Sequence, residues 1–130
     1  MPEHEHPLEA LHRGRDAVAE SVSLQARTPQ PSLNELHAFG SAIVGTLAEL
    51  SQLSSVLAEQ VGRFDEQDVE RAKTSNHPGD KLRLAGTHLA TLSAELAVAV
   101  TDATRYWTAI ESVHLHTSGD LRPRRQPEAQ

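Results

Sequence analysis

Apolar residues recur with a period of seven along residues 33–64, which is the pattern of one face of a long helix. The positions of this stripe are Leu36, Ile43, Leu50, Leu57 and Phe64. Phe39, Leu47, Leu53 and Val61 fill places three or four residues further on. Ser32 and Glu35 have the spacing of a capping box in front of the stripe. The pattern predicts a helix over 33–64, and helix-compatible polar residues extend the prediction to about residue 72.

A break at 74–80 separates this stripe from a second one. Pro78 disfavours helix at His77, Gly79 suits a turn, and Asp80 is a good N-cap for a new helix. One heptad position beyond the break holds Leu82, Leu89, Leu96, Ala103 and Ile110. Its partner position holds Ala85, Leu92, Ala99, Tyr106 and Val113. We predict a helix over 80–116 that lies antiparallel to the first, because the linker between them is short.

The N-terminal part carries a thinner stripe made of Leu8, Leu11, Val18 and Val22. It predicts a shorter helix over 7–26, ended by the prolines before Ser32. Residues 1–6 and 117–130 are polar and predict disordered ends. The expected fold is all-α: a long antiparallel helical hairpin plus a shorter N-terminal helix, with domain bounds of 7–116. The result is either a three-helix bundle or a four-helix core formed by dimerisation.

The apolar surface of the two long helices is wider than a hairpin can bury. Because exposed apolar area forfeits stability, we expect a homodimer in which the surplus side chains form the interface. These residues are Phe39, Val44, Leu47, Val56, Val98, Val100 and Trp107. Small residues, among them Gly40, Gly45 and Gly86, permit close approach of helix backbones.

Composition narrows the classes of function. The formal charge of −6 argues against nucleic-acid binding by the whole chain, and the absence of cysteine excludes disulfides, thiolate metal sites and cysteine nucleophiles. The N-terminus lacks a secretory signal, and the longest run without charge or histidine in the first long helix, 38–48, is short of the roughly 20 residues that span a bilayer. We expect a cytoplasmic protein without membrane contact. An arginine-rich, alanine-rich composition is typical of GC-rich bacterial genomes.

The chain has 8 histidines, a residue type that commonly binds metal ions. Pairs spaced Glu-x-x-His occur at Glu3/His6, Glu9/His12 and Glu111/His114. Such pairs hold di-metal centres in ferritin-like bundles, but Glu111 is expected on the side away from the helix seam. A hairpin that turns near residue 77 places His37 opposite His114 and His116, which makes these three the weak candidates for a zinc or pH-sensitive cluster. We predict no metal, no cofactor and no catalytic residue, since nucleophile elbows and phosphate loops are also absent.

In architecture the expected hairpin resembles the WXG100 group of small secreted proteins. That group has a Trp-x-Gly turn, whereas the turn here reads Asn76-His77-Pro78-Gly79. Its Tyr-x-x-x-Asp/Glu export signal would need an acid at position 110, which is Ile110. Membership is not assigned.

The sequence therefore favours a non-catalytic helical interaction protein, a scaffold, adaptor or regulator that binds itself and an unidentified protein partner. One alternative is a small-molecule- or metal-binding bundle that uses the histidine-rich end. Another is an accessory nucleic-acid-binding protein that uses the arginines of residues 122–125 with Arg13 and Arg15.

Overall fold

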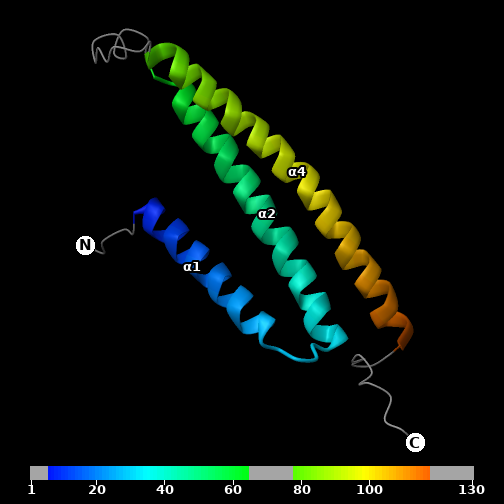
Figure 1. Ribbon diagram of the computed structural model, residues 1–130. Coiled ribbons are helices and arrows are strands. Elements are labelled where there is room, and N and C mark those ends of the chain that lie inside the picture. Colours follow the sequence, from blue (N-terminus) through cyan, green and yellow to red (C-terminus); the bar gives the residue numbers. More distant parts are fainter. Residues whose placement is uncertain (1–5, 65–77, 118–130) are drawn as a thin grey trace, which may run out of the picture. The chain divides into compact units, whose positions relative to one another are not determined.

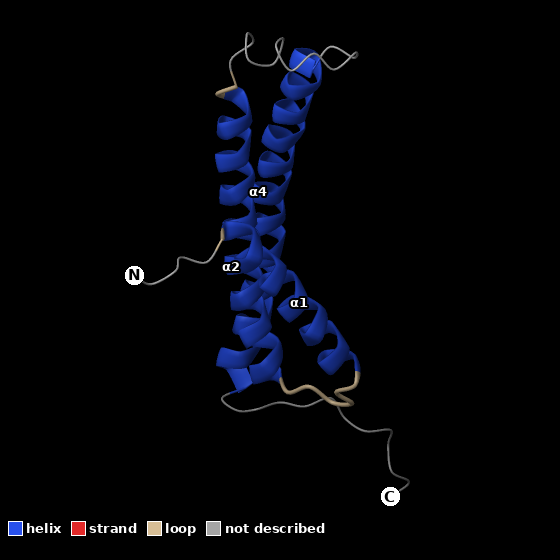
Figure 2. Cartoon of the chain, turned by 90° about the vertical axis from the view of Figure 1, so that its left-hand side faces the viewer, coloured by secondary structure: helices blue, strands red, loops and turns tan. Residues whose placement is uncertain are grey.

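A computed structural model describes residues 6–64 and 78–117, with the backbone alone for residues 78 and 114–117. Within these ranges every regular element is an α-helix: α1 (Pro7–Ala26), α2 (Leu33–Gly62) and α4 (Pro78–Thr117). Helices α2 and α4 run antiparallel and side by side (Figures 1 and 2). This confirms the all-α prediction of a long hairpin plus a shorter N-terminal helix. The chain forms two units, one with α1 and one with the hairpin, and each is described by itself.

Helix α1 starts where the sequence predicts it. His6 is its N-cap, and the imidazole Nδ1 accepts a hydrogen bond from the backbone N–H of Leu8 at 3.1 Å. Pro7 follows at the first helical position, where its missing N–H removes no helical hydrogen bond. No residue of α1 is buried, and Leu8, Val18 and Val22 are all more than half exposed.

The long helices depart slightly from their predicted bounds. Helix α2 begins directly after Ser32, as the capping box predicts, and ends at Gly62, two residues before Phe64. The predicted continuation over 65–72 and the predicted disorder of 1–5 and 118–130 lie outside the described residues. Helix α4 begins at Pro78, so the prediction that Asp80 caps it is wrong. Asp80 lies in the first turn, where a carboxylate is favoured by the helix dipole, and pairs with Arg83.

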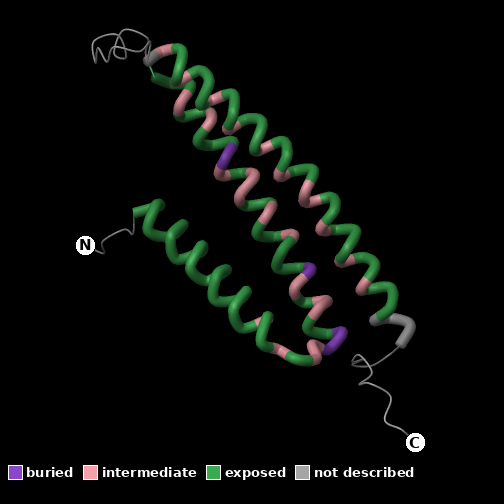
Figure 3. Tube along the Cα trace, in the orientation of Figure 1, coloured by how far each residue is buried: buried purple, intermediate pink, exposed green. Residues whose placement is uncertain are grey.

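Contacts between α2 and α4 define one continuous seam. A Cβ at Gly40 would lie 2.9–3.0 Å from Trp107, Ser51 and Ser93 exchange hydrogen bonds, and Gly86 lies against Val61. Heptad spacing from these contacts gives the α2 side as Leu33, His37, Gly40, Val44, Leu47, Ser51, Ser54, Ala58 and Val61. The α4 side is Leu82, Gly86, Leu89, Ser93, Leu96, Val100, Ala103, Trp107 and Ile110. Each of these residues is buried or partly buried, whereas most of the hairpin is exposed (Figure 3).

The seam differs from the most obvious sequence pattern. On α4 the stripe that includes Leu82 and Ile110 lies in the seam. On α2 a leucine-rich stripe lies beside the seam; it consists of Leu36, Ile43, Leu50 and Leu57. The α2 side of the seam is formed by a different stripe, which includes Gly40, Ser51 and Ser54. The physical reason is size: small side chains let the two backbones approach closely, and the larger leucines are then displaced to the side.

Candidate functional site

The displaced stripes of both helices lie on the same side of the hairpin. When the a and d positions of two antiparallel helices form the seam, the g positions of both helices lie on the same flank. Each g position comes directly before an a position. Here these positions are Leu36, Ile43, Leu50 and Leu57 on α2, with Ala85, Leu92, Ala99, Tyr106 and Val113 on α4. We call this set the apolar flank. None of its side chains is charged.

Much of the apolar flank is open to solvent. Ile43 is 43% exposed, Leu92 is 45% exposed and Val113 is 44% exposed. The Tyr106 hydroxyl donates a hydrogen bond to the backbone carbonyl of Leu36 at 2.8 Å, which ties the two helices together at this surface. The result is an uncharged, partly uncovered strip along the length of the hairpin.

The opposite flank has a different character. Its α2 positions are Ser41, Ala48, Ser55 and Gly62, and its α4 positions are Arg83, Ala90, Ala97, Thr104 and Glu111. Small and polar residues there leave little apolar area to cover. The two flanks therefore differ, because the apolar flank carries large apolar side chains and the opposite flank carries small, polar and charged ones.

The residues predicted to form a dimer interface do not lie together. Val44, Leu47, Val100 and Trp107 belong to the α2–α4 seam, and Phe39 is partly covered beside the apolar flank. Val56 and Val98 point outward and are 37% and 64% exposed. Their contact with a second copy stays a prediction. The stripe of Leu36, Ile43, Leu50 and Leu57 lies beside the seam, with Ile43 and Leu57 exposed and the other two partly buried.

Serine side chains hold the middle of the seam. Ser51 Oγ donates to the carbonyl of Ser93 at 2.9 Å, and Ser93 Oγ lies 2.9 Å from the carbonyl of Ser51. The two hydroxyls are 3.3 Å apart, and Ser55 Oγ lies 2.6 Å from Ser93 Oγ. These contacts fix how far one helix can slide along the other, because a shift of a single turn would break all of them.

A second polar cluster lies where α2 begins and α4 ends. The indole Nε1 of Trp107 donates to Nε2 of His37 at 3.1 Å, and the two rings are 5.9 Å apart between centroids. Glu111 Oε2 lies 3.4 Å from the same imidazole nitrogen. The side chains of His37 and Glu111 are 27% and 49% exposed. The expectation that Glu111 faces away from the seam is wrong. His37 belongs to the α2 side of the seam, and its imidazole lies next to the Glu111 carboxylate.

The metal hypothesis gains no ligand set from the described part of the chain. Among these residues, no group of three or more histidine, aspartate or glutamate side chains could hold a metal ion. His37 lies opposite Trp107 and Glu111, while the side chains of His114 and His116 are outside the described residues. The prediction that the protein binds no metal or cofactor stays a prediction.

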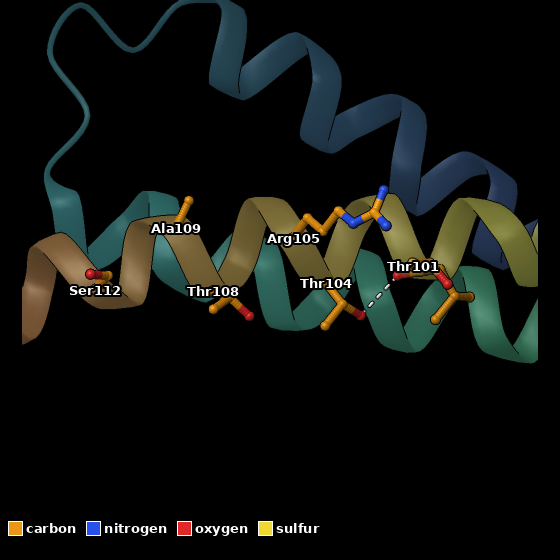
Figure 4. Close-up of a pocket in the computed structure, with 7 residues that line it drawn as sticks. Thr101, Thr104, Arg105, Thr108, Ala109 and Ser112 are labelled. Carbon is orange, nitrogen blue, oxygen red and sulfur yellow. Dashed lines mark hydrogen bonds between the residues drawn. The ribbon is translucent and has the colours of Figure 1, made fainter.

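A depression on the surface of α4 offers little chemistry (Figure 4). Its lining is Val100, Thr101, Thr104, Arg105, Thr108, Ala109 and Ser112, all from one helix. The Thr104 hydroxyl donates to the carbonyl of Val100 at 2.8 Å, so it is already bonded within its own helix. Arg105 lies 3.4 Å from Asp102. No pair of groups suited to acid–base or nucleophilic catalysis meets in this depression.

Comparisons with known proteins add no relative. No family model, no curated protein and no solved structure matches the chain. By length and composition alone, the segments Leu33–Gly62 and Gly79–Val113 are apolar enough to cross a membrane, and almost none of either segment is buried. Length and composition do not distinguish a membrane span from a helix of a soluble protein.

Proposed function

We propose that the protein is a non-catalytic helical interaction protein that pairs with a second copy of itself through the apolar flank. The observation that carries this proposal is the concentration of large apolar side chains on one uncharged flank. The described hairpin buries very little, with Leu33 as its buried hydrophobic residue. Burying a Leu or Val side chain in full contributes roughly 1.5–3 kcal/mol, and a half-exposed side chain has gained only part of that.

The dimensions of the flank suit a dimer. Helix α2 has 30 residues and is therefore about 45 Å long at 1.5 Å per residue. A layer of two helices is about 18 Å across, so the whole face that contains the flank has an area of about 800 Å². A specific and stable interface buries about 800 Å² on each partner. One hairpin flank is thus large enough to support a stable pair.

A second copy fits this surface by symmetry. A two-fold interface places the same patch on both partners, so the patch must be complementary to an identical patch. The apolar flank carries no charge, and two copies can approach without like-charge repulsion. Helix α1 has 20 residues and is about 30 Å long, which is shorter than the flank. Two hairpins joined in this way would form a four-helix core.

The distribution of charge favours a protein surface over a bilayer as the occupant. Glu49, Glu95 and Asp102 lie exposed near the middle of their helices. An ionised side chain at the centre of a membrane-spanning helix costs about 2.5–3.5 kcal/mol or more. A hairpin in water has no such cost, because these carboxylates remain solvated while the apolar flank is covered.

The test compares two leucines of the same helix. Leu92 lies on the apolar flank and is 45% exposed, whereas Leu84 points outward and is 56% exposed. We expect the wild type and the Leu84→Glu variant to form dimers at micromolar concentration in multi-angle light scattering. The Leu92→Glu variant is expected to be monomeric over the same range, because dimerisation would bury its carboxylate.

Three outcomes would contradict the proposal: a monomeric wild type, a dimer that survives Leu92→Glu, or equal loss of dimer in both variants. Flotation with lipid vesicles is the parallel measurement, and retention of the wild type on vesicles would favour a membrane surface instead. Circular dichroism of each variant separates loss of association from loss of helix.

A further inference from the structure

A row of charged and polar side chains borders the apolar flank on α4. Lys81, His88, Glu95 and Asp102 are spaced seven residues apart, and all four are exposed. Each of them comes four residues before a member of the apolar flank, as His88 does before Leu92. Residues four apart are neighbours on a helix surface, so these side chains follow the edge of the flank. We call them the charged row; its basic half lies toward the start of α4 and its acidic half toward the end.

The border of the flank on α2 carries no charge. The residues that come three positions after the α2 members of the flank are Phe39, Thr46, Leu53 and Gln60. Residues three apart are also neighbours on a helix surface. The ion-pairing groups along the edges of the flank therefore all come from α4, and they can pair across a dimer only where α4 meets a second α4.

Two symmetric arrangements can cover the apolar flank with a second copy. In one, the two-fold axis runs along the helices and places α4 over α2 of the second copy, so that the charged row faces an uncharged border. In the other, the axis runs across the helices and places α4 antiparallel on α4 of the second copy. The charged row then meets a copy of itself in reverse order.

Reversal makes the charged row complementary to itself. Lys81 and Asp102 are equally far from the middle of the row, and so are His88 and Glu95. Lys81 therefore lies opposite Asp102 of the second copy, and His88 can donate an N–H to the Glu95 carboxylate. Each pair occurs twice because of the symmetry. Asp102 also lies 3.4 Å from Arg105 of its own helix, but a carboxylate has acceptor sites for more than one donor.

The same row selects the register of the two helices. The middle of the α4 part of the apolar flank is Ala99. An antiparallel pair centred there would bring Glu95 next to Asp102 of the second copy, and like charges directly opposite each other are unfavourable. A pair centred on the middle of the charged row, beside Leu92, brings unlike groups together instead.

We propose that the charged row fixes the arrangement of the dimer, with α4 antiparallel on α4 of the second copy and the two-fold axis beside Leu92. This inference rests on the proposed dimerisation through the apolar flank. It assigns Lys81, His88, Glu95 and Asp102 as the residues by which one copy recognises another. The two Leu92 side chains meet near the axis, and the end of α4 after Tyr106 lies beyond the paired part.

Charge exchange tests the pairing. We expect Lys81→Glu and Asp102→Lys each to weaken dimerisation by about 2- to 30-fold in Kd, because an exposed ion pair contributes modestly and is present twice. The double variant has the net charge of the wild type and should recover most of the affinity. The same reversals at Arg63 and Glu59, an exposed pair of α2 away from the flank, are the control and should leave the Kd unchanged. Sedimentation equilibrium measures each Kd, and the differences should shrink in 1 M salt, where the Debye length is about 3 Å.

A distance measurement tests the register. The chain has no cysteine, so one introduced cysteine takes a single spin label per copy. Thr108 is exposed and lies away from the flank, so Thr108→Cys leaves the interface intact. At 1.5 Å per residue, labels there should lie about 50 Å apart along the helix axis. A pair centred on Ala99 gives about 27 Å, and α4 over α2 leaves only the width of the bundle, about 20 Å.

The outcomes separate this inference from the proposed function. A monomeric wild type, or a dimer that survives Leu92→Glu, would remove both. A wild-type dimer with labels at the shorter distances would overturn the arrangement alone. So would a double variant that dimerises no better than Lys81→Glu, or an equal loss of affinity in the control reversals.

Discussion

Gly40 is the position where the packing of the hairpin can be tested most directly. It is a helix-interior residue of α2, and glycine there costs about 1 kcal/mol relative to alanine in helix propensity. A Cβ at this site would lie 2.9 Å from Cδ1 and 3.0 Å from Cβ and Cγ of Trp107. These atoms are the root of a rigid side chain and cannot move aside as the tip of a flexible one would. Gly40→Ala therefore sets a favourable propensity against an unfavourable contact.

The balance can be worked out with a matched glycine. Gly45 lies in the same helix, and a Cβ there would meet nothing within 4 Å. Gly45→Ala should stabilise the protein by about 1 kcal/mol from propensity alone. Overpacking a well-filled contact costs about 1–3 kcal/mol. Gly40→Ala should consequently range from neutral to about 2 kcal/mol destabilising, and it should lie about 1–3 kcal/mol below Gly45→Ala.

Urea unfolding followed by circular dichroism measures both variants at one fixed protein concentration, because association would shift the midpoint. A Trp107→Ala background removes the contacts with Cδ1 and Cγ but keeps Cβ at 3.0 Å, so Gly40→Ala should be less destabilising there than in the wild type. If Gly40→Ala and Gly45→Ala stabilise the wild type equally, then Trp107 does not pack on Gly40 and the assigned seam is wrong.

Three further variants, at Ser93 and Tyr106, test the contacts that join the helices. Ser93→Ala removes the hydroxyl that reaches the carbonyl of Ser51 and should lower the unfolding free energy by about 0.5–1.5 kcal/mol, whereas Ser93→Leu should cost more because it forces the backbones apart. An equal loss in both would show that close approach is not needed there. Tyr106→Phe removes the bond to the Leu36 carbonyl and should cost about 0.5–1.5 kcal/mol in urea unfolding without changing the mass in light scattering. A stability equal to the wild type would mean that water replaces this bond.

The helices themselves could be predicted because their signals are local. A capping box before Leu33, a Pro-Gly break at 78–79 and sustained heptads fix the start, the turn and the length of each element. The start of α4 was missed by two residues, since Pro78 suits the first helical position as well as a loop. The type of an element follows from the period of its apolar positions. This period stays the same when the ends of the element are misplaced by a few residues.

The seam could not be predicted in the same way. Several stripes on α2 have heptad spacing, and the more apolar one was the natural choice for the contact with α4. Interhelical distance decides between them, and this distance depends on both helices at once. Gly40 matters only because Trp107 lies opposite, and Ser51 only because Ser93 does. The contact of Glu111 with His37 was missed for the same reason, since it follows from the seam.

The small residues of the seam also bear on the interaction surface that we propose. Small residues such as Gly40, Ser51 and Ser93 alternate in the seam with leucines and valines, and they allow α2 and α4 to approach closely. The leucines that would have filled a wider seam are left on the flank, where α4 adds its own apolar positions. Specific hydrogen bonds and the apolar residues of the seam fix the alignment inside the hairpin, and the exposed part of the apolar flank remains for the dimer contact that we propose.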